Sequence, residues 1–210
     1  TFGHLLKAMK EDFRDDEILR QYLLHKVPKF CKDKDATEFG KKVMDDLAEC
    51  LGGQANYRGG KFEPSLFAFY SYNWFKNVTI ATADGRKSES ALSRGVNPSE
   101  STENINIAAL LDAIKTMDYT KYPGGAVIYM DIPLMYKTPQ PSLFASVMRA
   151  FCENGGSIMD FNVISRNALL EAQKNPETHK NIVVRVCGYS AYFHTLTAEM
   201  QNEVIQRTQR

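Results

Sequence analysis

The sequence predicts an α/β protein in which parallel strands alternate with crossover helices. Two short apolar runs, residues 126–132 (AVIYMDI) and 157–164 (SIMDFNVI), have the length and composition of buried strands. Residues 142–152 lie between them and carry apolar side chains at helical spacing, and residues 167–174 show a second helical pattern after the second strand. This order favours parallel pairing, because parallel strands need a long crossover connection.

The first quarter of the chain is expected to be helical. Residues 1–13, 16–24 and 35–51 each repeat apolar side chains at the three- and four-residue intervals of an α-helix. The third helix is expected to end at Gly52 and Gly53, because glycine commonly follows the last turn of a helix.

The middle of the chain combines an aromatic segment with a long loop. Residues 62–74 (FEPSLFAFYSYNW) are rich in aromatic side chains and are expected to form a buried strand or extended segment of the core. A nucleic-acid stacking surface is not favoured, because basic residues do not alternate with these rings. Residues 79–104 are typical of a mobile lid or a linker, whereas residues 105–117 have the pattern of a helix.

The last strand-like run, residues 183–193 (VVRVCGYSAYF), is interrupted by one glycine. A glycine inside a strand weakens it unless the backbone needs the dihedral angles or the close approach that only glycine allows. On pattern alone, Gly188 is explained by a bulge or a tight turn between a terminal strand and a final helix over residues 197–207. Gly188 is therefore the first candidate for a special backbone role.

The composition is that of an ordinary globular protein. The 210 residues are enough for one or two domains, the hydrophobic content is 43%, and the formal net charge is +1. These values give no electrostatic basis for binding nucleic acid or a membrane surface. No apolar run has the length of a membrane span and no signal peptide is recognisable, so a cytoplasmic location is expected. Because the chain begins at Thr1 rather than at Met, we interpret it as a fragment or a trimmed chain.

The cysteines give no sign of a metal site. Cys31, Cys50, Cys152 and Cys187 form no C-x-x-C pair and have no histidine at ligand spacing. Neither zinc nor a disulfide framework is therefore expected, and the thiols are expected to be free.

Four short motifs resemble those of the glycyl radical enzymes, the superfamily of pyruvate formate-lyase and the glycerol and diol dehydratases. The most specific is R-V-x-G-Y-x-x-x-F at residues 185–193. Residues 58–64 (RGGKFEP) are similar to the family's R-G-G-x-F-x-P, and residues 81–86 (ATADGR) are similar to A-T-P-D-G-R. Residues 161–165 (FNVIS) are similar to F-N-V-V-S.

The chain departs from the family pattern at several positions. Residues 97–103 and 106–108 do not match the family's S-P-x-x-G-x-D and G-P-T-A motifs, and Ile158 and Asp160 stand where His and Gln are usual. Cys187 replaces the commoner Ala or Ser, and a small apolar filler is the usual role of a buried thiol. An acid on a buried strand needs hydrogen-bond donors, and both a functional and a structural role are open for Asp160.

The resemblance implies that Gly188 stores a backbone radical. In the family, the corresponding glycine loses one Cα hydrogen, and the unpaired electron is shared with the amide nitrogen and the carbonyl only if Cα becomes planar. Glycine suits this geometry because a Cβ would crowd it. The tip of the hairpin is expected to be buried, with Tyr189, Tyr192 and Phe193 packed about it, so that water and oxygen are excluded. The neighbours predicted to form the radical loop are Arg185, Val186, Cys187, Tyr189, Ser190 and Phe193.

The resemblance also implies an architecture. The chain would be the C-terminal part of a ten-stranded α/β barrel built from two five-stranded halves, and it would end in a glycyl radical loop and a C-terminal helix. Residues 1–83 would belong to the pyruvate formate-lyase-like barrel domain and residues 84–210 to the glycine radical domain, with the radical loop and terminal helix in residues 176–210. A separate S-adenosylmethionine and iron–sulfur activating enzyme would install the radical, so no cofactor or metal is expected to be bound by the chain itself.

The resemblance implies the activity of a lyase or dehydratase whose catalytic cysteine lies outside this chain. In the family the radical passes to a cysteine, whose thiyl removes hydrogen from a small-molecule substrate. Cys31, Cys50 and Cys152 do not lie in the family's contexts for that cysteine, and Cys187 adjoins the glycine itself. We therefore expect the chain to carry the radical without completing turnover alone, with the catalytic cysteine on the remaining barrel half. The family also tends to form homodimers.

Other classes stay open. A stand-alone spare-part module could dock on a glycyl radical enzyme that oxygen has damaged, and a non-radical α/β domain could use Gly188 only as a turn. Among enzymes, G-Y-S-A-Y-F at residues 188–193 is closer to the dehydratase and lyase branch than to the formate C-acetyltransferase branch. No residue of the chain predicts the substrate.

Overall fold

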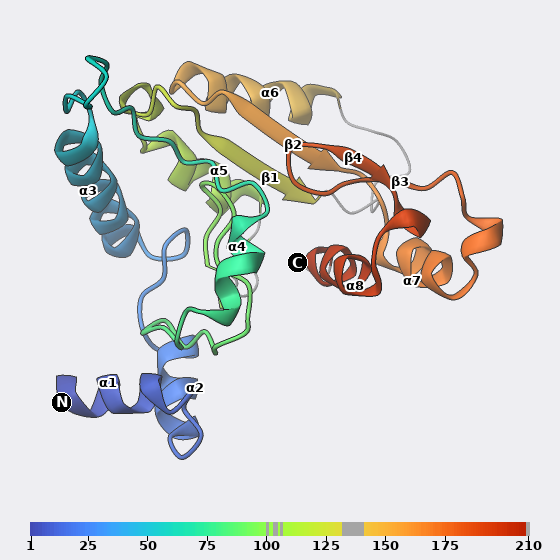
Figure 1. The fold of residues 1–210 in the computed structure, drawn as a ribbon, viewed down its shortest axis with the longest axis horizontal. Helices are drawn as coiled ribbons and strands as arrows, with labels where there is room; N and C mark the ends of the chain where they lie inside the picture. The colour runs from blue at the N-terminus through green and yellow to red at the C-terminus, as the bar shows by residue number, and fades with distance from the viewer. Residues whose placement is uncertain (100, 103–104, 106, 132–140, 209–210) are drawn as a thin grey trace.

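The computed structural model describes residues 1–99, 101–102, 105, 107–131 and 141–208, and its fold is mixed α/β. In Figure 1 the N-terminal helices lie at one end, a pair of strands runs through the molecule, and the C-terminal hairpin and helices lie at the other end. Residues 100, 103–104, 106 and 132, which belong to the predicted loop, helix and strand, lie outside the described residues.

Three helices form near the N-terminus, as the apolar periodicity predicts. They are α1 (Phe2–Lys10), α2 (Glu17–His25) and α3 (Lys34–Leu51). Thr1 caps α1 and Asp33 caps α3, because each side chain accepts a hydrogen bond from an amide of the first turn. The third helix ends at the glycine pair predicted to terminate it.

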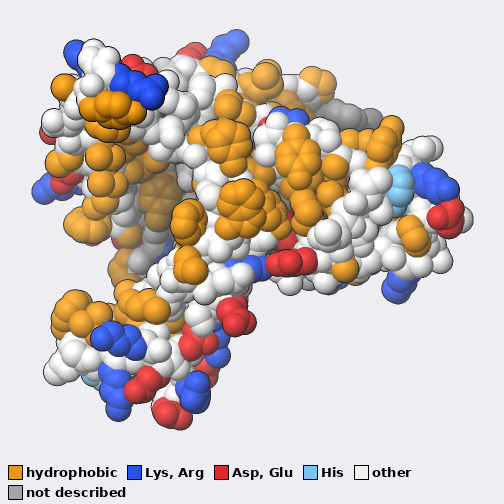
Figure 2. Space-filling model, in the orientation of Figure 1, with side chains coloured by type: hydrophobic (Ala, Val, Ile, Leu, Met, Phe, Trp, Pro, Cys, Tyr) orange, Lys and Arg blue, Asp and Glu red, His pale blue; other side chains and the backbone are white. Residues whose placement is uncertain are grey.

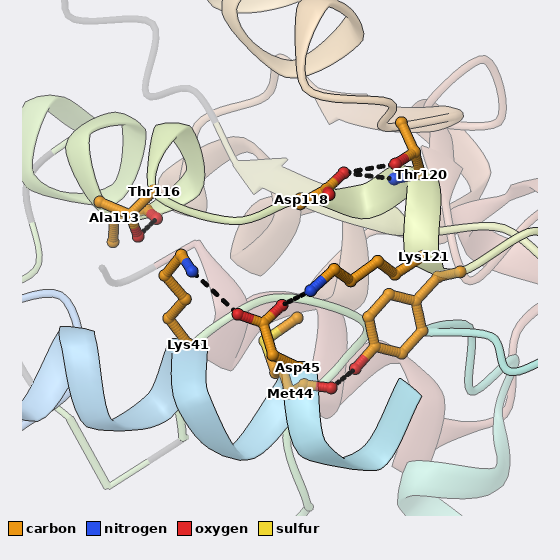
Figure 3. A network of polar contacts seen from close by, with 9 residues as sticks. Lys41, Met44, Asp45, Ala113, Thr116, Asp118, Thr120 and Lys121 are labelled. Atoms are coloured by element: carbon orange, nitrogen blue, oxygen red, sulfur yellow. Dashed lines mark hydrogen bonds and ion pairs between the residues drawn. The ribbon is translucent and has the colours of Figure 1, made fainter. Parts of the chain in front are cut away.

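A polar network joins α3 to the segment that precedes the central strands. Asp45 accepts hydrogen bonds from the ammonium groups of Lys41 and Lys121, both at 2.8 Å. Tyr122 donates its hydroxyl hydrogen to the Met44 carbonyl oxygen at 2.6 Å. Figure 3 shows these contacts converging on α3, so the segment that leads into the strands is held against this helix.

The predicted parallel unit is present. β1 (Val127–Asp131) and β2 (Ile158–Asn162) pair in parallel, and α6 (Pro141–Glu153) lies between them in the sequence. α5 (Ile107–Lys115), which corresponds to the helix predicted over residues 105–117, packs against α6. The expectation of parallel strands with a crossover helix is therefore confirmed.

The two faces of the strand pair have different neighbours, because alternate residues of a strand point to opposite faces. Ile128 and Met130 belong to the apolar cluster that includes residues of α5 and α6. Val127 and Tyr129 belong to a second cluster, which contains Cys187 of the C-terminal hairpin. The residues of this second face therefore position the hairpin.

The C-terminal part consists of a hairpin and two helices. β3 (Val183–Arg185) and β4 (Ser190–Tyr192) pair antiparallel and share a core with α7 (Arg166–Lys174) and α8 (Ala198–Arg207). Each large apolar side chain buried in this core contributes roughly 1.5–3 kcal/mol. The fully buried members include Leu169, Val184, Val186, Phe193 and Val204.

The aromatic segment over residues 62–74 does not form the predicted strand. Within the described residues it makes one isolated parallel bridge, between Leu66 and Ala126. Phe69 has a φ of +45°, which interrupts extended backbone, and the chain then turns into α4 (Ser71–Trp74). The local backbone therefore overrides the strand preference of the aromatic residues.

The prediction that these aromatic side chains belong to the core is wrong for several of them. Tyr72 is buried, but Phe62, Phe69 and Trp74 are 57%, 62% and 69% exposed. Figure 2 shows hydrophobic side chains gathered on the face that carries α3, α4 and the hairpin. Within the described part of the chain, no segment buries these three rings.

The described residues of the loop over residues 79–104 are folded, so the linker prediction is wrong, while the mobility of a lid stays a prediction. Arg86 is buried, and its guanidinium group donates hydrogen bonds to the carbonyl oxygens of Ile80, Lys87 and Ser90. These bonds close the loop on itself, so its conformation is fixed by a side chain that composition alone does not single out.

Short helical segments complete the connections. They are the 3₁₀ helices η1 (Phe75–Asn77), η2 (Tyr119–Lys121), η3 (Pro176–Thr178) and η4 (Phe193–Thr195).

In the described ranges no helix is long and apolar enough to cross a membrane.

Candidate functional site

Strand β2 offers two polar side chains to the C-terminal hairpin. Asp160 and Asn162 are two residues apart and so point to the same face, and Tyr129 lies opposite Asp160 on β1. Met159 and Phe161, which alternate with them along β2, pack against the apolar cluster on the other face. The alternating sequence I-M-D-F-N therefore places a polar surface beneath the hairpin.

Four hydrogen bonds join these two side chains to the hairpin. Asn162 accepts the amide hydrogen of Arg185 at 2.8 Å and donates to the Arg185 carbonyl oxygen at 3.1 Å, as a neighbouring strand would. Asp160, which is 4% exposed, accepts from Arg185 Nε at 2.9 Å through Oδ1. Its Oδ2 accepts from the Gly188 amide nitrogen at 3.2 Å. The buried acid therefore has the donors that its position requires.

Gly188 lies at the tip of the hairpin, in the two-residue turn Cys187–Gly188. The turn is closed by a hydrogen bond from the Val186 amide to the Tyr189 carbonyl oxygen at 2.9 Å. Gly188 has a φ of +77°, a conformation that costs energy for any residue with a Cβ. A Cβ built there would lie 3.6 Å from Phe67 Cζ, which is an ordinary contact. The conformation of the turn, rather than lack of space, therefore favours glycine.

The tip is not buried in this chain, contrary to the prediction. Gly188 and Ser190 are exposed, and Tyr189 and Tyr192 are 48% and 54% exposed. Of the three rings expected around the glycine, Phe193 alone is buried, because it packs into the core of α7 and α8. The aromatic side chains near Gly188 thus form an open surface in the described part of the chain.

Cys187 is buried beside the tip and makes polar contacts that a filler would not need. Its thiol donates a hydrogen bond to the Phe69 carbonyl oxygen, and its Sγ lies 3.0 Å from the Tyr129 hydroxyl. Burial, and next the hydrogen bond with Cys187, raise the pKa of Tyr129, so the phenol stays protonated at neutral pH. Cys187 therefore ties the turn both to β1 and to the segment before α4.

The A-T-A-D-G-R motif forms a second polar cluster. Asp84 accepts hydrogen bonds from the hydroxyl groups of Thr82, Ser99 and Ser101, and from the Arg86 amide. Burial alone would raise the pKa of Asp84, but the hydrogen bonds, led by that of Ser101, outweigh it and lower this pKa to about 2. These contacts lie within the loop, so the motif stabilises the loop's own fold.

The structure brings Arg185, Cys187 and Gly188 together with two residues that were not predicted as site residues: Tyr129, and Asn162, which lies in the F-N-V-I-S motif. Both lie on the face of the strand pair that carries Asp160: Tyr129 is paired with Asp160 in the register of β1 and β2, and Asn162 is two residues further along β2. This shared face is the feature of the sequence pattern that could have identified them. Among the residues that the structure describes, no group of three His, Cys, Asp or Glu side chains could hold a metal ion.

Comparisons with known proteins identify the family of the chain. The family model described as Glycine radical matches residues 92–194, and the model described as Pyruvate formate lyase-like matches residues 1–76. Trans-4-hydroxy-L-proline dehydratase of Clostridioides difficile is 29% identical over 98% of this chain, and isethionate sulfite-lyase of Nitratidesulfovibrio vulgaris is 30% identical over 99%. The glycerol-bound B12-independent glycerol dehydratase of Clostridium butyricum aligns over 97% of the chain with a TM-score of 0.85 and 30% identity.

These matches show that the α/β fold of this chain also occurs within larger enzymes. The chain belongs to the glycyl radical enzyme superfamily, as its motifs predicted. It spans 26% of the length of each of these three relatives.

Proposed function

We propose that this chain stores a glycyl radical on Gly188 and is the radical-bearing part of a lyase or dehydratase. The observation that carries the proposal is the convergence of two family motifs on one turn. Arg185 and Gly188 of the hairpin motif both donate to Asp160, and Arg185 also pairs with Asn162 of the F-N-V motif. The names of the relatives, a lyase and two dehydratases, support this branch of the family.

Radical storage would begin with removal of one hydrogen atom from Gly188 Cα. A separate activating enzyme would supply a carbon-centred radical, generated from S-adenosylmethionine at an iron–sulfur cluster, and this radical would take the hydrogen. Gly188 would then hold one unpaired electron and no added charge. Its lack of a Cβ supports the planar geometry that such a radical needs, and its exposure in the described structure gives a partner access to it.

In the whole enzyme the radical would pass to a cysteine thiol, whose thiyl would act on a small-molecule substrate. The cysteines of this chain do not suit that role: Cys31, Cys50 and Cys152 lie outside the family's cysteine motifs, and Cys187 adjoins Gly188 itself. We place the catalytic cysteine in the remaining half of a ten-stranded barrel. That half would cover Phe69 and Trp74, which are exposed in this chain.

The same proposal divides the chain into two domains. Residues 1–83 would belong to the barrel domain and residues 84–210 to the glycine radical domain, with the radical loop and terminal helix in residues 176–210. The chain itself would bind no cofactor. A cytoplasmic location and a homodimer stay predictions from the resemblance.

Oxygen provides a test, because a backbone radical exposed to air leads to cleavage of the chain at that residue. The protein would be activated without oxygen by an activating enzyme of demonstrated competence, exposed to air, and analysed by mass spectrometry. We expect two fragments produced by backbone cleavage at Gly188, and no such cleavage in Gly188→Ala. An intact wild-type chain, or the same fragments from both proteins, would refute the proposal.

A further inference from the structure

The side chain of Asp160 on β2 reaches the glycine of the turn. Its Oδ2 accepts the Gly188 amide hydrogen, with a nitrogen–oxygen distance of 3.2 Å, while its Oδ1 is occupied by Arg185 Nε at 2.9 Å. The carboxyl group is 4% exposed, so water does not weaken either bond by competition. We propose that Asp160 is a positioning residue for the radical, acting through the amide nitrogen of Gly188. This inference rests on the proposed function of Gly188.

The ion pair with Arg185 fixes the direction of the Asp160 carboxylate. The backbone of Arg185 is held separately, because its amide and carbonyl groups are both bonded to Asn162. With Oδ1 held by the guanidinium group, Oδ2 is left aimed at the tip of the hairpin. The carboxylate is therefore placed before any radical forms, and no rearrangement is needed to hold the Gly188 amide.

An anionic acceptor affects the radical in two ways. It holds the peptide unit before Gly188 in the orientation found with φ at +77°, so the nitrogen orbital keeps a fixed relation to Cα. A bond from N–H to a carboxylate is also stronger than one to a neutral acceptor and leaves more electron density on the nitrogen. That nitrogen is the electron-donating partner of a Cα radical. Asp160 should therefore increase the share of unpaired spin that the Gly188 nitrogen carries.

A purely structural role would consist of holding Arg185, and Asn162 provides the matched control for it. Both side chains lie on the same face of β2 and both bind Arg185, but Asp160 also binds Gly188. Asn162→Ala weakens the attachment of Arg185 and leaves the Gly188 contact in place. Asp160→Asn keeps the size of the side chain and removes its charge.

The test compares these variants in the full-length polypeptide as its gene encodes it. Glycine labelled with ¹⁵N would be incorporated, the protein would be activated without oxygen, and the nitrogen hyperfine coupling of the radical would be measured by electron–nuclear double resonance. We expect a smaller ¹⁵N coupling in Asp160→Asn than in the wild type, and an unchanged coupling in Asn162→Ala.

A second measurement needs no radical. In the unactivated protein, the Gly188 amide should exchange with deuterium about tenfold faster or more in Asp160→Ala than in the wild type, because a hydrogen bond to a charged acceptor has been lost. Amides of α7 and α8 serve as the control for folding, and Asp160→Asn replaces Asp160→Ala if the latter does not fold.

The outcomes separate the two claims. A wild-type radical whose ¹⁵N coupling is the same in Asp160→Asn would overturn the role of Asp160 and leave radical storage intact. Equal exchange of the Gly188 amide in wild type and variant would also overturn it. A wild-type protein that forms no radical with a competent activating enzyme would overturn the proposed function, and this inference with it.

Discussion

Replacing Gly188 by alanine should abolish the radical while leaving the fold nearly intact. Gly188 has a φ of +77°, where a residue with a Cβ pays about 1–2 kcal/mol. The added Cβ would lie 3.6 Å from Phe67 Cζ, so no steric penalty adds to that cost. The free energy of unfolding should fall by about 1–2 kcal/mol, and Tm should fall by roughly 2–4 °C for each kcal/mol.

Gly95→Ala provides a contrast, because its expected loss of stability is larger than that of Gly188→Ala. Gly95 also has a positive φ, +52°, but a Cβ there would lie 2.2 Å from the Val127 carbonyl oxygen and 2.7 Å from Val127 Cγ1. Because backbone of the central strand would have to move, Gly95→Ala should cost on the order of 4 kcal/mol or more. Urea and thermal denaturation of both variants measure the difference.

The result that would refute this reasoning is a Gly188→Ala variant as unstable as Gly95→Ala. The glycine at the tip would then be required for packing, and loss of the radical in that variant would prove nothing about the radical site. A well-folded Gly188→Ala that still acquires the radical would place the radical on another residue.

The A-T-A-D-G-R turn gives two stability predictions, and the cysteines give a third. Arg86→Ala should lower the free energy of unfolding by about 3 kcal/mol, because three carbonyl oxygens lose a charged donor; urea denaturation measures this, and Lys87→Ala is the near-neutral control. The lowered pKa of Asp84, about 2, lies below the usual unfolded value near 3.9. Its contribution should therefore be complete above about pH 4 and be lost as the pH falls towards 2. Asp84→Asn should remove this acid-dependent part, and a wild-type stability that is flat over this range would contradict the assignment. Iodoacetamide should label the exposed thiols of the native protein well before the buried ones, and equally fast labelling would show that the buried thiols are accessible. The exposed thiols are Cys50 and Cys152, and the buried ones are Cys31 and Cys187.

The sequence predicted the parts of the fold that depend on local periodicity. The strands over residues 127–131 and 158–162, with a helix between them, form as a parallel pair because apolar runs of that length need cover on both faces. The prediction for the aromatic segment 62–74 was wrong in part: Tyr72 is buried, but aromatic composition does not reveal the positive φ of Phe69 that ends the extended backbone. The exposure of its rings is a tertiary property, which composition does not reveal either.

The candidate site was predicted in part. Gly188 and Arg185 were found through the family motif, and Asp160 stood out as an acid on a buried strand. Tyr129 was missed, and Asn162 was noticed only as part of the F-N-V-I-S motif, because the roles of both arise from the register of β1 with β2 and from the docking of a hairpin more than twenty residues further along the chain. Strand register and hairpin docking are tertiary properties, and a local sequence pattern does not determine them.

The central claim is that Gly188 holds an unpaired electron. The most direct measurement is an electron paramagnetic resonance spectrum recorded without oxygen, after incubation with a competent activating enzyme, S-adenosylmethionine and a reductant. We predict a doublet from coupling to the one hydrogen that remains on Gly188 Cα, and we predict that this signal is absent in Gly188→Ala. A silent wild-type spectrum, or a doublet that persists in Gly188→Ala, would contradict the account.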